Sequence, residues 1–366
     1  MGQEFVVGRG QDPDAGPSGH LGAYRALDGS QGAPLYLDLD SPHAVLIVGK
    51  RGSGKSYTLG VIAESLARAN GVAPVVLDPM DVFTTLEQPA RSDASPVPAD
   101  VIDDPAVAPS ALDPRSWCAL LGLSPASGAG GLVWQAASEV ETLDEMRDHV
   151  DATNAPDVDK RAAVNHVDMA EAWGVFDADG LTADDLAGSE VTVVSVAGMS
   201  SDPMNAVARG VGEALYRARE TETIDRLPWL LIDEAHTFFE GVAQSALETI
   251  LTRGRAPGVS LTMATQRPSA VPEVGVSQSD VLLSHRLTAE ADLDALQAAR
   301  PTNLNASLTD EGRMPTETGE VLVIDDATET THAAQVRRRD TPHGGESPSA
   351  SDILLDGAGE DAAGGE

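Results

Sequence analysis

Residues Gly49–Ser56 read Gly-Lys-Arg-Gly-Ser-Gly-Lys-Ser and follow directly on the apolar run Ala44–Val48. The pattern G-x-x-x-x-G-K-[ST] lets glycine backbone N–H groups curl around phosphates. Downstream, Leu59, Ile62 and Leu66 share one helical face. A helix starting at the loop directs its positive end toward bound phosphate. The stretch therefore predicts a strand, a phosphate loop and a helix, in preference to an ordinary glycine-rich turn.

Within this loop, each residue type has a role in binding a nucleoside triphosphate. Lys55 is expected to reach the β- and γ-phosphates, and the Ser56 hydroxyl to be a magnesium ligand. We therefore expect ATP with Mg²⁺ as the cofactor, bound by Gly49, Lys50, Arg51, Gly52, Ser53, Gly54, Lys55, Ser56 and Tyr57.

The charge of the chain indicates a salty environment. Among 366 residues, 58 are acidic and 24 basic, which gives a formal net charge of −34. Such a charge opposes a compact state unless salt screens it. We infer a high-salt cytoplasm, as in halophilic archaea. Lysine occurs only as Lys50, Lys55 and Lys160, and two of these lie in the phosphate loop.

Other compositional features indicate a soluble cytoplasmic protein. The single cysteine, Cys118, excludes an internal disulfide and is most simply a small buried apolar residue. No apolar run approaches the roughly 18 residues of a membrane span, and the N-terminus lacks a signal-peptide pattern. We expect no membrane partner. The histidines show no metal-ligand spacing, so no zinc site is assigned.

The order of apolar runs predicts an α/β fold with a mainly parallel sheet flanked by helices, because near-continuous apolar strands alternating with helices are buried on both faces. The expected core strands lie at Val45–Val48, Val75–Leu77, Val191–Val196, Leu230–Ile232, Val259–Thr265, Val281–Leu283 and Val321–Ile324. A hairpin is expected around Asp28-Gly29.

Composition divides the chain into four parts. Residues 1–20 are expected to be a flexible N-terminus, and residues 21–87 with 176–339 the ATPase core. Residues 88–175 are expected to form a linker followed by a helical insertion, in which Asp113-Pro114 starts a helix and helical spacing covers 130–150 and 157–175. Residues 340–366 are expected to be a disordered acidic tail.

A second motif supplies the carboxylates of the expected site. The apolar run Pro228–Ile232 ends in Asp233-Glu234. Asp233 is expected to hold the magnesium ion, and Glu234 to polarise the water that attacks the γ-phosphate. Gln266 ends the next apolar run. In phosphate-loop ATPases with a catalytic glutamate, the strand that this run would form lies between the strand that precedes the phosphate loop and the strand that precedes Asp233. Gln266 is therefore expected to face the γ-phosphate and to sense it.

These segments together resemble the HerA/FtsK superfamily of ring-forming DNA motors, and the archaeal HerA ATPases in particular. The resemblance rests on Gly49–Ser56, Asp233–His236, Gly254–Gly258, Ala264–Pro268, Gln278–Asp280 and His285–Leu287, and it covers roughly residues 42–339. It implies a RecA-like ATPase that works as a homo-hexamer around duplex DNA. It also implies that ATP binds between subunits and that an arginine of the next subunit completes each site.

By position in these motifs, two arginines resemble catalytic residues of the superfamily. Arg255 resembles the arginine supplied across the interface, and Arg286 a second phosphate-facing arginine; Arg253 and Arg267 match less well. A guanidinium group there stabilises charge on the transferring phosphoryl group. An arginine in a surface ion pair is the alternative for each.

Two departures limit the resemblance. HerA proteins have an N-terminal β-barrel that docks a nuclease. About 40 residues precede the first core strand of this chain, which is too few for such a barrel, so a nuclease partner is doubtful for this chain. After the second core strand the superfamily has Asp-Pro-His-Gly-Glu-Tyr, whereas this chain has Asp-Pro-Met-Asp-Val-Phe at Asp78–Phe83.

Three functions remain to be weighed. An ATP-driven DNA translocase is favoured, and an ATPase of the same fold that remodels or switches a protein partner is the alternative. A metabolic kinase is disfavoured because it needs neither Glu234 nor the Gln-Arg-Pro segment. The basic run Arg337–Arg339 is either a contact to phosphate or to a neighbouring subunit, or a solvated strand end.

Overall fold

The computed structural model describes residues 5–9, 16–26, 28–298 and 314–344. Its strands are β1 Phe5–Val7, β2 Ser18–Arg25, β3 Gln31–Asp38, β4 Ala44–Val48, β5 Val72–Asp78, β6 Ala99–Ile102, β7 Val191–Ser195, β8 Leu227–Ile232, β9 Ser260–Thr265, β10 Val281–Ser284, β11 Glu320–Asp325 and β12 Thr330–Val336. Its helices are α1 Lys55–Ala67, α2 Pro114–Leu120, α3 Gly128–Glu139, α4 Leu143–Ala152, α5 Asp157–Glu171, α6 Ala183–Leu186, α7 Ser201–Glu220, α8 His236–Phe239, α9 Gln244–Arg253, α10 Glu273–Ser277 and α11 Glu290–Ala298. Short 3₁₀ turns occupy Pro109–Ala111 and Pro268–Ala270.

In the described residues the strands form one sheet, in the order β1-β3-β2-β12-β11-β10-β4-β9-β8-β5-β7-β6. The run from β10 to β6 is parallel throughout. Strands β11, β12, β2 and β3 extend it with antiparallel pairs. The predicted α/β, RecA-like fold with a mainly parallel sheet is confirmed, and β9 lies between β4 and β8 as expected.

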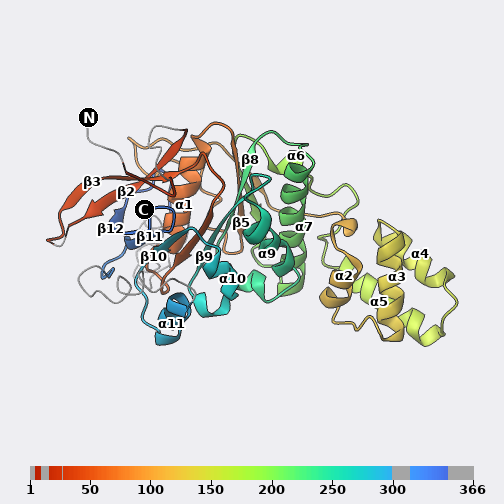
Figure 1. Ribbon diagram of the computed structural model, residues 1–366. Coiled ribbons are helices and arrows are strands. Elements are labelled where there is room, and N and C mark those ends of the chain that lie inside the picture. Colours follow the sequence, from red (N-terminus) through yellow and green to blue (C-terminus); the bar gives the residue numbers. More distant parts are fainter. Residues whose placement is uncertain (1–4, 10–15, 27, 299–313, 345–366) are drawn as a thin grey trace, which may run out of the picture.

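Two hydrophobic cores cover the faces of this sheet, and the strands supply alternate residues to each. In β4, Leu46 and Val48 pack into the core that also contains Val207 of α7 and Leu247 of α9. The intervening residues of β4 pack instead into the core beneath α1. Period-two alternation along a strand with both faces buried explains why these strands are apolar throughout. Figure 1 shows α1 and the α7/α9 pair on opposite sides of the sheet.

Helices α2 to α5 form an insertion beyond the β6 edge of the sheet (Figure 1) and have a core of their own, which includes Trp117, Val133, Met146 and Val167. Asp113 caps α2 by accepting hydrogen bonds from the N–H groups of Arg115 at 2.9 Å and Ser116 at 3.0 Å, with proline following at the first helical position. The helical spacing over 130–150 is divided into two helices, because Thr142 begins α4 with a capping box.

Three segments expected to lack regular structure are ordered. Phe5–Val7, in the predicted flexible N-terminus, forms β1 beside β3. Ala99–Ile102, in the predicted linker, forms β6 beside β7. Residues 340–344, at the start of the predicted tail, pack along α1, where Asp340 and Thr341 donate backbone N–H groups to Glu64 at 2.9 Å. Residues 345–366 lie outside the described residues. Among the described helices, none is long and apolar enough to cross a bilayer.

Candidate active site

The phosphate loop joins the carboxyl end of β4 to the start of α1 and depends on glycine at several positions. Gly52 and Gly54 have φ angles of 74° and 109°, in the left-handed region that glycine adopts without a steric penalty. At Gly49 the constraint is space: a Cβ atom there would lie 2.5 Å from Ser53 Oγ and 2.6 Å from His285 Cβ. A tight loop can therefore form directly against the neighbouring strand.

Lys55 keeps its ammonium group inside the loop. The side chain is buried, and Nζ donates to the carbonyl oxygen of Lys50 at 3.2 Å. Burial lowers the pKa of Lys55, while the nearby Glu234 and Asp233 carboxylates oppose that shift. The cation is thus placed between the loop backbone and the two carboxylates. The sequence predicts this arrangement for a lysine that reaches the β- and γ-phosphates.

Ser56 and Asp233, the two expected magnesium ligands, meet at the carboxyl ends of β4 and β8. Asp233 accepts hydrogen bonds from the Ser56 side chain and from the Glu234 N–H group, the latter at 2.9 Å. It is only 1% exposed, and burial raises its pKa. A hydroxyl and a carboxylate oxygen are the hard donors that Mg²⁺ prefers. The donor set therefore fits the ion that the fold family implies.

Glu234 carries an oxygen atom suited to accept a proton. Its Oε2 atom is buried and makes no hydrogen bond to any described residue, and His236 Nδ1 lies 3.4 Å away. Burial raises the pKa of Glu234, as does Asp233, whereas Lys55 and a hydrogen bond with Gln266 lower it. A buried carboxylate oxygen without a hydrogen bond is costly unless it serves a ligand or a water molecule. Glu234 therefore fits the predicted role of general base.

Gln266 lies where the strand order predicts. Strand β9 pairs with β4 on one side and with β8 on the other, so Gln266 leaves the sheet between the phosphate loop and Asp233-Glu234. Its side chain hydrogen-bonds with Glu234. Beside it, Thr265 Oγ1 lies 3.2 Å from His236 Nδ1. An amide in this position can contact both a γ-phosphate and the water that Glu234 polarises.

The structure separates the two candidate arginines. Arg286 follows β10, and its carbonyl oxygen accepts the N–H of Lys50 at 2.8 Å, so it lies beside the phosphate loop of its own chain. Arg255 is exposed and lines a hollow with Pro42, Ala44 and Asp280. Those residues lie at the amino ends of β4 and β10, whereas the phosphate loop lies at the carboxyl end. A single chain therefore does not bring Arg255 to its own loop.

Two buried residues beside the site were not among the predicted site residues. His285 bridges Thr58 Oγ1 and the carbonyl oxygen of Glu320, each at 2.9 Å, and burial lowers its pKa to about 4. Asp78 ends β5 next to β8 and accepts the N–H groups of Met80 and Phe83. Burial raises the pKa of Asp78 to about 6, with a further contribution from Asp233. Asp78 is the last residue of a core strand and His285 directly follows one, and that position is the signal that could have identified them.

A cavity of about 410 Å³ opens next to the loop, lined by Gly52, Gly54, Tyr57, Thr318 and His343 among others. Tyr57 and His343 pack edge to face, with ring centroids 5.8 Å apart. The Tyr57 hydroxyl accepts the N–H of Arg339 at 2.6 Å. Aromatic rings beside a phosphate loop suit a nucleoside. The predicted contribution of Tyr57 to nucleotide binding is consistent with this geometry and stays a prediction.

The model of the helicase HerA central domain matches residues 20–208, which is more than half of the chain. The chain belongs to the HerA central-domain family. The predicted resemblance is confirmed at this level, and family membership supports ATPase activity with ATP as the nucleotide.

Solved structures with a similar fold cover nearly the whole chain. The structure of VirB4 of Thermoanaerobacter pseudethanolicus has a TM-score of 0.64 and 16% identity, covering 94% of this chain and 100% of that one. The bacterial conjugative coupling protein TrwB, in a form called TrwBdeltaN70, has a TM-score of 0.56 and 14% identity, covering 90% and 97%. At these identities the similarity shows the fold. A search of curated proteins found no match.

Proposed function

We propose that this HerA-type ATPase is an ATP-driven motor that works as a homo-hexameric ring on duplex DNA. The observation that carries the catalytic part is the buried carboxylate of Glu234, which lies near Lys55 and hydrogen-bonds with Gln266. Its Oε2 atom makes no hydrogen bond within the described residues and has only the 3.4 Å contact with His236. The DNA and ring parts are supported by membership of a family whose model describes a helicase.

In the proposed mechanism the loop glycines hold the triphosphate with backbone N–H groups, and Lys55 neutralises charge on the β- and γ-phosphates. Ser56 and Asp233 would hold Mg²⁺, which supplies electrostatic stabilisation of the phosphates. Glu234 accepts a proton from the attacking water at Oε2. Gln266, bonded to Glu234, orients that water.

An arginine from a second subunit completes this site in the proposal. Arg255 is exposed at the sheet edge opposite its own phosphate loop, which leaves it available to a neighbour arranged head to tail. Arg286, next to its own loop, would contact the same phosphates from within the chain. In this proposal Arg255 is supplied by the neighbouring subunit, and Arg286 by the chain that carries the phosphate loop.

The deciding experiment measures ATP hydrolysis at molar KCl with and without duplex DNA. A motor that runs on DNA should hydrolyse ATP faster when DNA is present. The same stimulation should be absent in Glu234→Gln, which keeps the fold and removes the base. Hydrolysis that is indifferent to DNA would support the alternative, an ATPase that remodels or switches a protein partner.

A further inference from the structure

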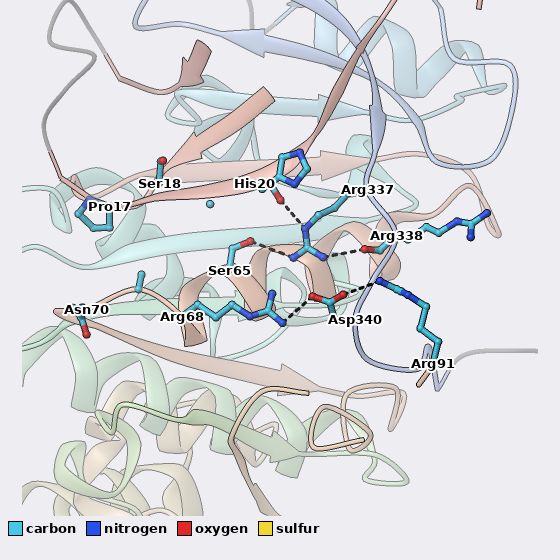
Figure 2. A pocket seen from close by; sticks show the side chains of 12 residues that line it. Pro17, Ser18, His20, Ser65, Arg68, Asn70, Arg91, Arg337, Arg338 and Asp340 are labelled. Carbon is cyan, nitrogen blue, oxygen red and sulfur yellow. Dashed lines mark hydrogen bonds and ion pairs between the residues drawn. The ribbon is translucent and has the colours of Figure 1, made fainter. Parts of the chain in front are cut away.

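Two adjoining hollows behind α1 share Arg337, Arg338 and His20, and together they form what we call the arginine trough. One hollow has a volume of about 760 Å³ and reaches Arg68 and Arg91. The other has a volume of about 610 Å³ and reaches Arg25. The trough runs beside β2 and the end of β12. Arg337 and Arg338 also line the cavity beside the phosphate loop, so the trough adjoins the candidate active site. Figure 2 shows the larger hollow.

The charge of the trough is opposite to that of the chain. Its lining contains five arginines, namely Arg25, Arg68, Arg91, Arg337 and Arg338, and two acidic residues, Asp340 and Glu320. In the whole sequence acidic residues outnumber basic ones 58 to 24. A cluster of arginines in so acidic a chain creates a local positive potential, which attracts an anionic ligand.

Arg337 lines both hollows of the trough, and its guanidinium group is bound by other residues of the chain. Its guanidinium donates to the carbonyl oxygen of His20 at 2.8 Å and to Glu64 Oε2 at 2.7 Å. It also donates to the carbonyl oxygens of Arg338 and Val61 and to Ser65 Oγ. With these partners its donors are used, so Arg337 supplies positive potential without being free to hold a ligand by hydrogen bonds.

The other arginines of the larger hollow keep donors in reserve. Arg68 donates to Asp340 at 2.9 Å and to the carbonyl oxygen of Ser95 at 2.8 Å, and its side chain is 39% exposed. Arg91 donates to Asp340 at 3.0 Å and to the carbonyl oxygen of Arg339 at 2.8 Å, and its side chain is 40% exposed. Arg91 also pairs with Asp93, which is 77% exposed, so this second ion pair is weak. Arg338 is exposed, and in Figure 2 its side chain extends away from Asp340.

We propose that the arginine trough binds the phosphodiester backbone of a nucleic acid. Planar guanidinium groups bind phosphate oxygens through paired hydrogen bonds. The two joined hollows share Arg337 and Arg338 and together contain five arginines, which is more than one small anion needs. Asp340 shows that an oxyanion can bridge Arg68 and Arg91.

The test is binding of a labelled random-sequence DNA duplex to the full chain, without nucleotide, at several KCl concentrations. Each arginine that contacts a phosphate contributes about one to the slope of log affinity against log salt. Arg68→Gln/Arg338→Gln should therefore bind more weakly and reduce that slope by about two. The matched control is Arg115→Gln, an exposed arginine on the insertion. It should bind as the unmodified chain does.

Two results would overturn the proposal. One is an unchanged affinity and slope in the double variant. The other is tighter binding of polyglutamate than of DNA of equal charge, since that would indicate an acidic protein as the ligand. The choice of DNA as the probe rests on the proposed function, but the assay does not. Binding at the trough is measured without ATP, so failure of DNA to stimulate hydrolysis would be a separate result.

Discussion

Glu234 adopts a backbone conformation that few residues other than glycine occupy, with a φ angle of 47°. Conformations of this kind cost about 1 to 3 kcal/mol and persist where the surroundings enforce them, often at functional sites. Here the turn directs the side chain back over Asp233 toward Lys55 and Gln266. Strand β8 alone would have directed two successive carboxylates to opposite faces of the sheet.

Glu234→Gln should bind ATP and hydrolyse it at least about a hundredfold more slowly, because an amide keeps the shape but cannot take the proton. The measurement is steady-state phosphate release beside equilibrium binding of a fluorescent ATP analogue. Glu240→Gln, at the exposed end of α8, is the matched control and should hydrolyse ATP normally. Normal hydrolysis by Glu234→Gln would assign the base to another residue.

Lys55→Ala should abolish ATP hydrolysis in molar KCl, because no other lysine or arginine of the loop is buried against the two carboxylates. Phosphate release is again the measurement. Lys160→Ala removes a lysine whose Nζ donates to the carbonyl oxygen of Asp151 on the insertion, and it should retain activity. Wild-type turnover in Lys55→Ala would contradict the assignment of the nucleotide site.

The candidate site was predictable in part, since the loop motif and the strand-end pair Asp233-Glu234 are local in sequence. The structure adds Thr58, His285 and the bridge between them, which joins residues 227 positions apart. The residue types alone did not indicate this, because a buried histidine and a helical threonine are ordinary core residues; for His285 the available signal was its position directly after an apolar run. Only the adjacency of β10 and β4 makes them neighbours of the loop.

At the scale of elements, apolar content decided which strands could be predicted. The parallel strands are buried on both faces and read as continuous apolar runs. Strand β12, Thr-Thr-His-Ala-Ala-Gln-Val, is only half-buried over most of its length, so its sequence lacks that signal. Strand β6 is short, has polar neighbours and lies at the sheet edge. Its pairing depends on β7, far along the chain.

The amino edge of the parallel sheet contains a titrating cluster. His43 Nδ1 contacts Asp280 at 2.7 Å, and Nε2 contacts Asp38 at 3.1 Å. Arg9 also bonds Asp38, at 2.8 Å. Burial alone would lower the pKa of His43, but the two carboxylates raise it to about 9. The histidine is therefore charged in the folded chain at neutral pH.

The cluster should make stability fall at alkaline pH. Its contribution is complete below the unfolded pKa of 6.5 and is lost as pH rises through about 9. The shift corresponds to about 3 kcal/mol. His43→Asn should lack this loss. Chemical denaturation of both chains at mildly acidic and at alkaline pH in high KCl measures the difference. Equal pH dependence in the two would show that His43 is neutral in the folded state.

At the scale of the whole molecule, the site described in one chain lacks an arginine that faces the γ-phosphate from outside. We therefore expect complementation between defective subunits. Arg255→Ala chains keep the loop, and Lys55→Ala chains keep the arginine. Random mixed rings should contain roughly one complete interface in four and recover hydrolysis accordingly.

The measurement compares ATP hydrolysis of the mixture with that of each variant alone, with differently tagged chains used to show that mixed rings form. The control is a mixture of Lys55→Ala and Glu234→Gln chains. Arg255 is intact in both, but Lys55 and Glu234 belong to the same half of each site, so no pairing of these two chains gives a complete site. That mixture should recover less. Mixed rings of Arg255→Ala and Lys55→Ala that gain nothing would place the role of Arg255 within its own chain.

The order in which a ribosome makes this chain has a consequence for the helix that follows the phosphate loop. Glu64 of α1 is fully buried and is bound by Arg337 and by the N–H and hydroxyl groups of Thr341, which lies 277 residues later. At 5–20 residues per second, roughly 15 to 55 s separate the synthesis of these partners. During that interval α1 carries an uncompensated carboxylate on the face that residues 337–341 will cover. We therefore expect that a nascent chain does not hydrolyse ATP until Arg337 and Thr341 have been added and have paired with Glu64.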